Sequence, residues 1–181
     1  MNEVMKIGIT GLPSAGKTHT LIRIIEMIEA EGKSVGGMIT EPIIQRGQRV
    51  GFYVLDWARK KRKRFAHVKI ESQITVGKYG VDLRALDTVG VSAILDACKN
   101  ADVVVIDEVG KMEVESEKFV AAVKEALDAE KTTILTLHKK SRNPLLQDIR
   151  RRDDIRILEV TPINRNLLPY KVMKLLKGEL L

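Results

Sequence analysis

The sequence predicts an α/β protein: a three-layer α/β/α sandwich on a mainly parallel sheet of five strands, with an inserted β-hairpin. Two observations predict this fold. Short runs of Val, Ile and Leu alternate with longer segments of helical period, as in strands joined by crossover helices. The chain has 181 residues, 44% of them apolar, which suits one domain over 1–181 with its own core.

Five apolar runs are the expected strands, because strands covered on both faces are rich in branched aliphatic residues. These runs are 4–10, 34–40, 101–107, 132–137 and 155–160. In the gaps, apolar residues recur at spacings of three and four, which predicts helices. The helices are expected over 16–31, 88–99, 116–129, 144–152 and 164–177, with Ser116 capping the third.

One region departs from this alternation. Residues 49–55 and 65–70 have the pattern of two short strands joined by a charged turn, with no helix between them. This predicts a β-hairpin inserted at about 47–72. Glycines and weak periodicity in 76–91 predict a loop packed beside the hairpin.

A phosphate-binding loop is the strongest motif in the chain. It reads Gly11-Leu12-Pro13-Ser14-Ala15-Gly16-Lys17-Thr18, the P-loop or Walker A pattern, between the strand-like KIGIT and an amphipathic helix. Glycine allows the turn and a close approach of phosphates, which the start of the following helix attracts. Lys17 is expected to reach the β- and γ-phosphates and to act in catalysis, and Thr18 to ligate Mg²⁺.

A second motif, the Walker B pattern, ends in two carboxylates. Four apolar residues precede Asp107 and Glu108, as at the ligand edge of a central parallel strand. Asp107 is expected to share the metal with Thr18, and Glu108 to deprotonate the attacking water. Gly110 would let the chain bend near the phosphates. Lys111 either stabilises the transition state or pairs with nearby glutamates, Glu113 or Glu115.

With these motifs the chain resembles the thermophile nucleoside-triphosphatase family, also known as the cancer-related nucleoside-triphosphatase family, within the P-loop NTPase superfamily. The resemblance covers most of the chain, and its segments are IDEVGKME, MITEP, GQRVGF, GKYGVDL and VTPINR. It implies a RecA-like or kinase-like core and Mg²⁺-dependent hydrolysis of ATP, GTP and other nucleoside triphosphates to the diphosphate and phosphate.

The resemblance also implies which residues contact the nucleotide. They are the loop residues 11–18 and the strand and turn Val103, Val104, Val105, Ile106, Asp107, Glu108, Val109 and Gly110. Ser14 and Ala15 depart from the family pattern, which usually has Gly at the first position and often a β-branched residue at the second. These departures bear on loop geometry and nucleotide preference.

Arginines are candidates for neutralising charge on the transferring phosphate. Arg142 follows the fourth predicted strand and is expected to form a lid over the phosphates. Arg165 is expected near the base, and 150–152 form a third basic group. His138 ends a strand on the same edge, where a structural role is the commoner one.

Charge and composition leave two other functions open. The net charge of +7 favours anionic partners, and the six basic residues of 59–64 could grip a nucleic-acid backbone. A solvated hairpin tip explains the same run and is the preferred interpretation, since only 4% of residues are aromatic. The alternatives to hydrolysis are a small-molecule or nucleotide kinase and a nucleic-acid-binding protein with a regulatory nucleotide site.

The cellular location is expected to be cytoplasmic. Cys98 is the single cysteine, which suits a reducing compartment, and it lies in an apolar-periodic segment that predicts a structural thiol. The amino terminus does not resemble a secretory signal, and no apolar run approaches the length of a membrane span, so no membrane association is expected.

Overall fold

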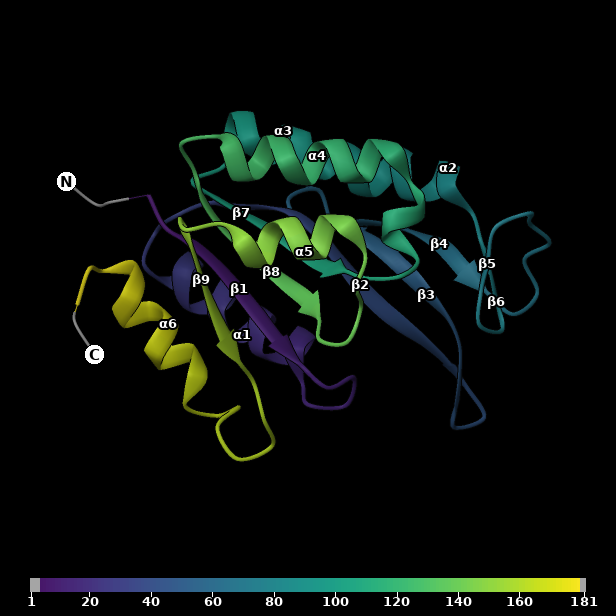
Figure 1. Ribbon diagram of the computed structural model, residues 1–181, viewed down its shortest axis with the longest axis horizontal. Coiled ribbons are helices and arrows are strands. Elements are labelled where there is room, and N and C mark those ends of the chain that lie inside the picture. The colour runs from purple at the N-terminus through teal and green to yellow at the C-terminus, as the bar shows by residue number, and fades with distance from the viewer. Residues whose placement is uncertain (1–3, 180–181) are drawn as a thin grey trace.

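The computed structural model describes residues 4–179, which contain a mixed nine-stranded sheet (Figure 1). Five strands run parallel in the order β2-β7-β8-β1-β9, which confirms the predicted parallel core. They are β1 (Lys6–Gly11), β2 (Val35–Gln45), β7 (Val103–Val109), β8 (Thr132–His138) and β9 (Ile155–Glu159). Strand β8 separates β1 from β7, so the two motif-bearing strands are not neighbours.

Helices cover both faces of this sheet and complete the predicted three layers (Figure 1). One face carries α1 (Lys17–Ala30) and α6 (Leu168–Leu176). The other carries α3 (Ser92–Asn100), α4 (Glu117–Asp128) and α5 (Pro144–Arg151). Strand β7 is buried against both layers, which explains why its first four residues, 103–106, are all apolar and do not alternate with polar ones.

Two of the helix ends show why the boundaries lie where they do. The Ser116 hydroxyl accepts a hydrogen bond from the Phe119 N–H at 3.1 Å, so Ser116 caps α4 as predicted. Helix α6 begins at Leu168, four residues after the predicted start. The Thr161 N–H donates to Oδ1 of Asn164 at 2.8 Å, and the Asn164 N–H donates to Oγ1 of Thr161 at 3.2 Å. The chain therefore forms a turn at the expected start of the helix.

An antiparallel extension continues the sheet beyond β2. It consists of β3 (Gln48–Asp56), β4 (Lys61–His67), β5 (Thr75–Val76) and β6 (Tyr79–Val81). The predicted hairpin is present as β3 and β4, but the expectation that 59–64 form its turn is wrong, because β4 begins at Lys61. Along 61–64 it pairs only with β3, and an open strand edge favours charged side chains.

The loop predicted over 76–91 is also wrong. Besides β5 and β6, this region contains a short helix α2 (Leu83–Ala85) and a π-helical segment η1 (Leu86–Val91) that runs into α3. The Asp82 carboxylate caps α2 by accepting the Ala85 N–H at 3.0 Å. Gly90 is part of the pattern that predicts a loop. In the structure, its missing side chain lets the helix pack closely against Met38, since a Cβ at Gly90 would lie 2.6 Å from the Met38 sulfur.

None of the helices within residues 4–179 combines the length and the apolar character that crossing a membrane requires. Cys98 is partly buried in α3, and burial raises the pKa of its thiol, in keeping with the predicted structural role.

Candidate nucleotide-binding site

The two glycines of the phosphate loop are required by the backbone and by packing. Gly16 has φ 95° and ψ 32°, a left-handed conformation that glycine adopts without strain. At Gly11, a Cβ atom would lie 2.7 Å from the carbonyl oxygen of Val160, which leaves no room for a side chain. Helix α1 begins directly after this turn at Lys17, so its free N–H groups face the loop.

Lys17 lies at the centre of the loop. Its side chain is only 6% exposed, and its ammonium group donates to the carbonyl oxygen of Gly11 at 3.0 Å. The same nitrogen is 3.3 Å from Oε2 of Glu108, so an ion pair joins the loop to the end of β7. The arrangement brings together two residues that are 91 positions apart in the sequence, counted as 108 minus 17.

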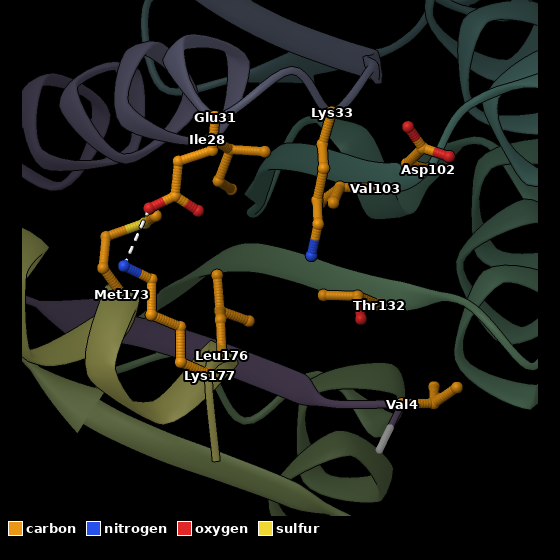
Figure 2. A pocket seen from close by; sticks show the side chains of 10 residues that line it. All are labelled: Val4, Ile28, Glu31, Lys33, Asp102, Val103, Thr132, Met173, Leu176 and Lys177. Carbon is orange, nitrogen blue, oxygen red and sulfur yellow. Dashed lines mark ion pairs between the residues drawn. The ribbon is translucent and has the colours of Figure 1, made fainter. Parts of the chain in front are cut away.

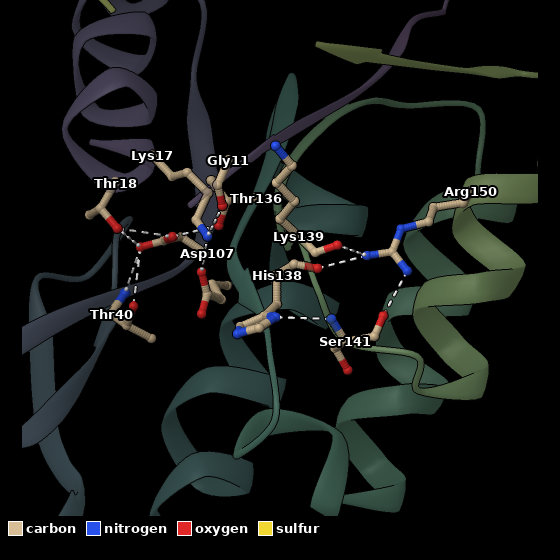
Figure 3. Close-up of polar contacts among 11 residues, drawn as sticks. Gly11, Lys17, Thr18, Thr40, Asp107, Thr136, His138, Lys139, Ser141 and Arg150 are labelled. Atoms are coloured by element: carbon tan, nitrogen blue, oxygen red, sulfur yellow. Dashed lines mark hydrogen bonds and ion pairs between the residues drawn. The ribbon is translucent and has the colours of Figure 1, made fainter. Parts of the chain in front are cut away.

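Asp107 is fully buried within a set of threonines (Figure 3). The Thr18 hydroxyl lies 3.1 and 3.0 Å from its two carboxylate oxygens, and the Thr136 hydroxyl donates to Oδ1 at 2.6 Å. Thr40 donates to Oδ2 from its N–H and its hydroxyl, at 3.3 and 3.2 Å. Burial raises the pKa of Asp107 to about 6, and the charge of Glu108 adds to this, whereas the threonine hydrogen bonds oppose it.

Glu108 leaves the core at a bulge. The ladder between β7 and β8 is regular up to Ile106 opposite Leu135 and resumes with Val109 opposite Leu137. The extra residue of β7 forms a β-bulge. The side chains beside it therefore no longer alternate regularly between the two faces of the sheet, as is common for bulges near active sites. The Glu108 side chain is 29% exposed and lines a cavity.

Gly110 and Glu113 complete the surroundings of Glu108. A Cβ at Gly110 would lie 2.9 Å from Oε1 of Glu108 and 3.1 Å from Oε1 of Glu113, so the two carboxyl groups approach each other over this glycine. Glu113 is 2% exposed, and its Oε2 has no hydrogen-bond partner among the described residues. Burial, and then the charge of Glu108, raise the pKa of Glu113 well above its usual value. Burial therefore favours the protonated form of Glu113.

The cavity has a volume of about 590 Å³ and two distinct walls. The wall formed by the phosphate loop and the start of α1 comprises Pro13, Ser14, Gly16, Lys17, Thr18 and His19. The opposite wall comes from β2 and the antiparallel extension and comprises Thr40, Pro42, Arg49, Phe52, Val76, Gly77 and Tyr79. Glu108 and Glu113 lie with Lys111, Met112 and His138 along the remaining side.

Comparison with known proteins identifies the family. The sequence model of a family described as NTPase matches residues 6–173. The chain belongs to the NTPase family. Nucleoside-triphosphatase THEP1 of Thermoplasma volcanium is 40% identical to it, over 97% of this chain and 98% of the relative.

Two solved structures are similar to this NTPase-family chain along nearly its whole length. The crystal structure of THEP1 from the hyperthermophile Aquifex aeolicus has a TM-score of 0.85 and 31% identity, covering 96% of this chain and 99% of that one. The solution structure of a human cancer-related nucleoside triphosphatase has a TM-score of 0.82 and 29% identity, covering 98% and 100%. The resemblance and the fold class predicted from the sequence are thereby confirmed.

The strand segment predicted to touch nucleotide in this NTPase is too long. Among residues 103–110, only Glu108 lines the cavity. Val104, Val105 and Ile106 have no exposed surface, because β7 is packed between two helix layers. Val103 lines a separate cavity of about 370 Å³ at the start of the strand (Figure 2). Val103 lies four positions before Asp107, which at the rise of a strand is roughly 13 Å.

The predicted arginines differ in their relation to the loop. The Cδ atom of Arg165 lies 3.7 Å from the position of a Cβ at Gly16, so Arg165 adjoins the loop on the side of β9. Arg142 is exposed and does not line the cavity. Lys111 does line it, and within residues 4–179 Lys111 forms no ion pair with Glu113 or Glu115.

The segment after β8 is held in place by Arg150 (Figure 3). Its guanidinium donates to the carbonyl oxygens of His138 and Ser141, both at 2.7 Å, and of Lys139 at 3.1 Å. The Ser141 N–H donates to Nδ1 of His138 at 3.1 Å, which leaves Nε2 to carry the proton of the neutral ring. Burial lowers the pKa of His138, with Lys17 and Lys111 contributing in the same direction.

Sequence reasoning missed Thr40, Thr136 and Glu113 as parts of this site. Threonine is common in strands, so neither Thr40 in MITEP nor Thr136 in ILTLH stands out. The available signal was that each follows the apolar part of a strand that flanks β7, since polar side chains where parallel pairing ends face the ligand edge. Glu113 was considered only as a surface partner of Lys111.

Proposed function

We propose that this chain is a Mg²⁺-dependent nucleoside triphosphatase, folded as one domain, that hydrolyses the terminal phosphate of ATP, GTP and other nucleoside triphosphates. The observation that carries the proposal is the ion pair of Lys17 with Glu108 beside the Thr18–Asp107 contact. A cation for the β- and γ-phosphates, a carboxylate for the attacking water and an oxygen pair for the metal converge at one loop. The activity named for the related proteins supports the same conclusion.

The residues around Asp107 fit Mg²⁺. The ion prefers hard oxygen ligands, and the Thr18 hydroxyl and the Asp107 carboxylate bring such oxygens from two elements to within 3.0 Å. Thr40 and Thr136 orient the same carboxylate as outer partners. We assign Thr18 and Asp107 as the residues that would hold the metal. When bound, Mg²⁺ supplies charge neutralisation at the β- and γ-phosphate oxygens.

The loop residues would bind the phosphates through Lys17 and backbone N–H groups of 11–18. Lys17 has a further role in our proposal. Its ammonium group is shared between Gly11 and Glu108, and a triphosphate tail would compete for it. Once Lys17 turns to the phosphate oxygens, Glu108 is released to accept the proton of the attacking water. Substrate binding would thus create the general base.

The nucleoside is assigned to the side of β9. Loop N–H groups hold the α- and β-phosphates while Lys17 and Thr18 mark the terminal phosphate, so the nucleoside extends away from Asp107. Arg165 adjoins Gly16 on that side and is the proposed neighbour of the base. Arg142 and Lys111 are the weaker candidates for transition-state contacts. The single cysteine supports a cytoplasmic location.

The test is phosphate release from ATP, GTP, CTP and UTP with and without Mg²⁺, in the absence of any acceptor. We expect release with all four, and a requirement for the metal. Lys17→Ala serves as the control against contaminating phosphatases, because it should abolish the activity of the preparation. Glu108→Gln should lower kcat about 10²- to 10⁴-fold and retain binding of a non-hydrolysable ATP analogue. Unchanged release by either variant would refute the assignment.

A further inference from the structure

The cavity extends well beyond the residues that hydrolysis needs. Thr40 contacts Asp107, and two residues further along β2, roughly 7 Å away, Pro42 lies opposite Phe52 in the ladder with β3. This second wall therefore starts next to the metal ligands and leads away from the phosphate loop. In the proposed function, it lies beyond the terminal phosphate and not beside the nucleoside of the substrate.

Aromatic rings and a cation form this wall. Phe52 and Tyr79 pack edge to face, with centroids 5.5 Å apart and an interplanar angle of 73°. The Arg49 guanidinium lies 5.4 Å from the centroid of Phe52, and the Tyr79 hydroxyl donates to the Arg49 carbonyl oxygen at 3.3 Å. Both rings are partly exposed to the cavity, and Arg49 is exposed with no carboxylate partner among the described residues.

Lys111 is a second cation in this space, whereas the two carboxylates that line the cavity lie together near the phosphate loop, where Glu108 pairs with Lys17 and Glu113 is buried beside Glu108. Lys111 lines the side between the two walls, is exposed, and forms no ion pair within the described part of the chain. The exposed aromatic faces suit a planar ring, and the two cations suit an anion. None of these groups contacts Asp107, Glu108 or Lys17 through a hydrogen bond or ion pair in residues 4–179.

We propose that the wall of Arg49, Phe52 and Tyr79 binds a second ligand of the nucleoside monophosphate class, facing the terminal phosphate of the bound triphosphate. The base stacks on the aromatic pair, and the phosphate is held by Arg49 and Lys111. Such a ligand occupies the space from which water reaches the terminal phosphate, so it also slows hydrolysis. The proposal rests on the proposed function for the direction in which the triphosphate lies.

Calorimetric titration of a ternary complex tests the proposal. The protein is saturated with Mg²⁺ and a non-hydrolysable ATP analogue, so that the phosphate loop is occupied, and AMP, GMP, CMP and UMP are added in turn. We expect one further molecule to bind per chain, with ribose 5-phosphate binding more weakly because it lacks the ring. Phe52→Leu preserves apolar packing and should weaken binding roughly tenfold, the loss of one stacking platform.

Two further variants make the test specific. Arg49→Ala should weaken the binding of the monophosphates. Arg64 is an exposed cation of the same extension that lies outside the cavity, so Arg64→Ala should leave their binding unchanged. A bisubstrate molecule with two nucleosides joined by five phosphates should bind the wild-type protein more tightly than ATP, since one linked molecule occupies both sites. Arg49→Ala should lose that gain and keep wild-type hydrolysis of ATP.

Two results would overturn the inference. One is the absence of binding by every monophosphate up to about 1 mM with the analogue bound. The other is a raised KM for ATP in Phe52→Leu and Arg49→Ala, which would place the base of the substrate itself on this wall. Either result would leave the proposed triphosphatase activity unaffected. Failure of the ATP analogue to bind would instead count against the proposed function.

Discussion

The phosphate loop and the antiparallel extension form opposite walls of one cavity, and they are built differently. On the loop wall, the buried Lys17 pairs with Glu108 of the distant strand β7, and the Thr18 hydroxyl contacts the buried Asp107 of the same strand. On the extension wall, Arg49 is exposed and its contacts are with neighbours in the same small sheet. The first wall is fixed by contacts between distant strands, whereas the second combines an exposed cation with two rings that pack against the core.

This difference suggests a division of labour. A group that must be positioned for phosphoryl transfer needs partners that fix it to within a fraction of an ångström. A surface that selects a ligand needs mainly shape and charge, which an appended sheet can supply. Substitutions on the loop wall should therefore affect turnover strongly, and those on the extension should affect turnover little.

Beyond Lys17 and Glu108, the largest effect on turnover is expected at Thr18. Thr18→Ala removes a proposed metal ligand and one hydrogen-bond donor to Asp107, and we expect kcat/KM to fall about 10²- to 10³-fold. Thr18→Ser retains the hydroxyl and is the matched control, with activity within a few-fold of wild type. The measurement is phosphate release over a range of Mg²⁺ concentrations. Equal loss in both variants would show that the methyl group, and not the hydroxyl, is what matters.

The next effect concerns stability and comes from the burial of Asp107. Its folded-state pKa is raised to about 6 from 3.8, so the folded protein binds the proton more tightly than the unfolded chain. This contribution to stability is fully present below about pH 4 and is lost as the pH rises through 6. It amounts to something on the order of 3 kcal/mol.

The measurement is the free energy of unfolding between pH 4 and 7, without metal or nucleotide, for the wild type and Asp107→Asn. The variant cannot titrate at this position, so its unfolding free energy should fall less over this range. The charge of Asp107 also helps to raise the pKa of Glu113, so the comparison reports Asp107 together with its coupling to Glu113. Parallel pH curves would mean that Asp107 is better solvated than its burial indicates.

A smaller effect is expected from Gly110→Ala. The added methyl group would lie 2.9 Å from Oε1 and 3.1 Å from Cγ of Glu108, and 3.1 Å from Oε1 of Glu113, all of them side-chain atoms. The fold should survive, and Glu108 should be displaced by a fraction of an ångström. We expect kcat to fall roughly 10- to 100-fold, with nucleotide affinity and the thermal midpoint nearly unchanged. A wild-type kcat would show that the position of Glu108 is not critical.

The sequence predicted those parts of the molecule whose signals are local. The phosphate loop is a contiguous motif, and the parallel strands are contiguous apolar runs, so both could be predicted without knowing the topology. Thr40 and Thr136 could not, because each matters only through strands that flank β7 in space. The segment 83–91 was missed for a related reason: whether Gly90 breaks a helix or packs against Met38 depends on the tertiary structure.

The basic run 59–64 is the part of the extension where the smallest effect on turnover is expected. Arg59 pairs with Asp56 and Asp96, each at 3.2 Å, and Arg62 pairs with Glu41 at 3.3 Å, which reduces the free charge of the run. The four residues within β4 also alternate between the two faces of the strand, so they form no single stripe for a nucleic-acid backbone.

We therefore expect the double variant Lys61→Glu, Lys63→Glu to hydrolyse ATP within about twofold of wild type, since exposed charges far from a site act weakly through solvent. Titration of single- and double-stranded oligonucleotides at low and moderate salt completes the comparison. Weak binding at low salt that disappears with added salt, in wild type and variant alike, fits a solvated edge. Tight binding by the wild type that the double variant loses would mean that β4 binds nucleic acid, and the extension would then serve a polymer as well as a small ligand.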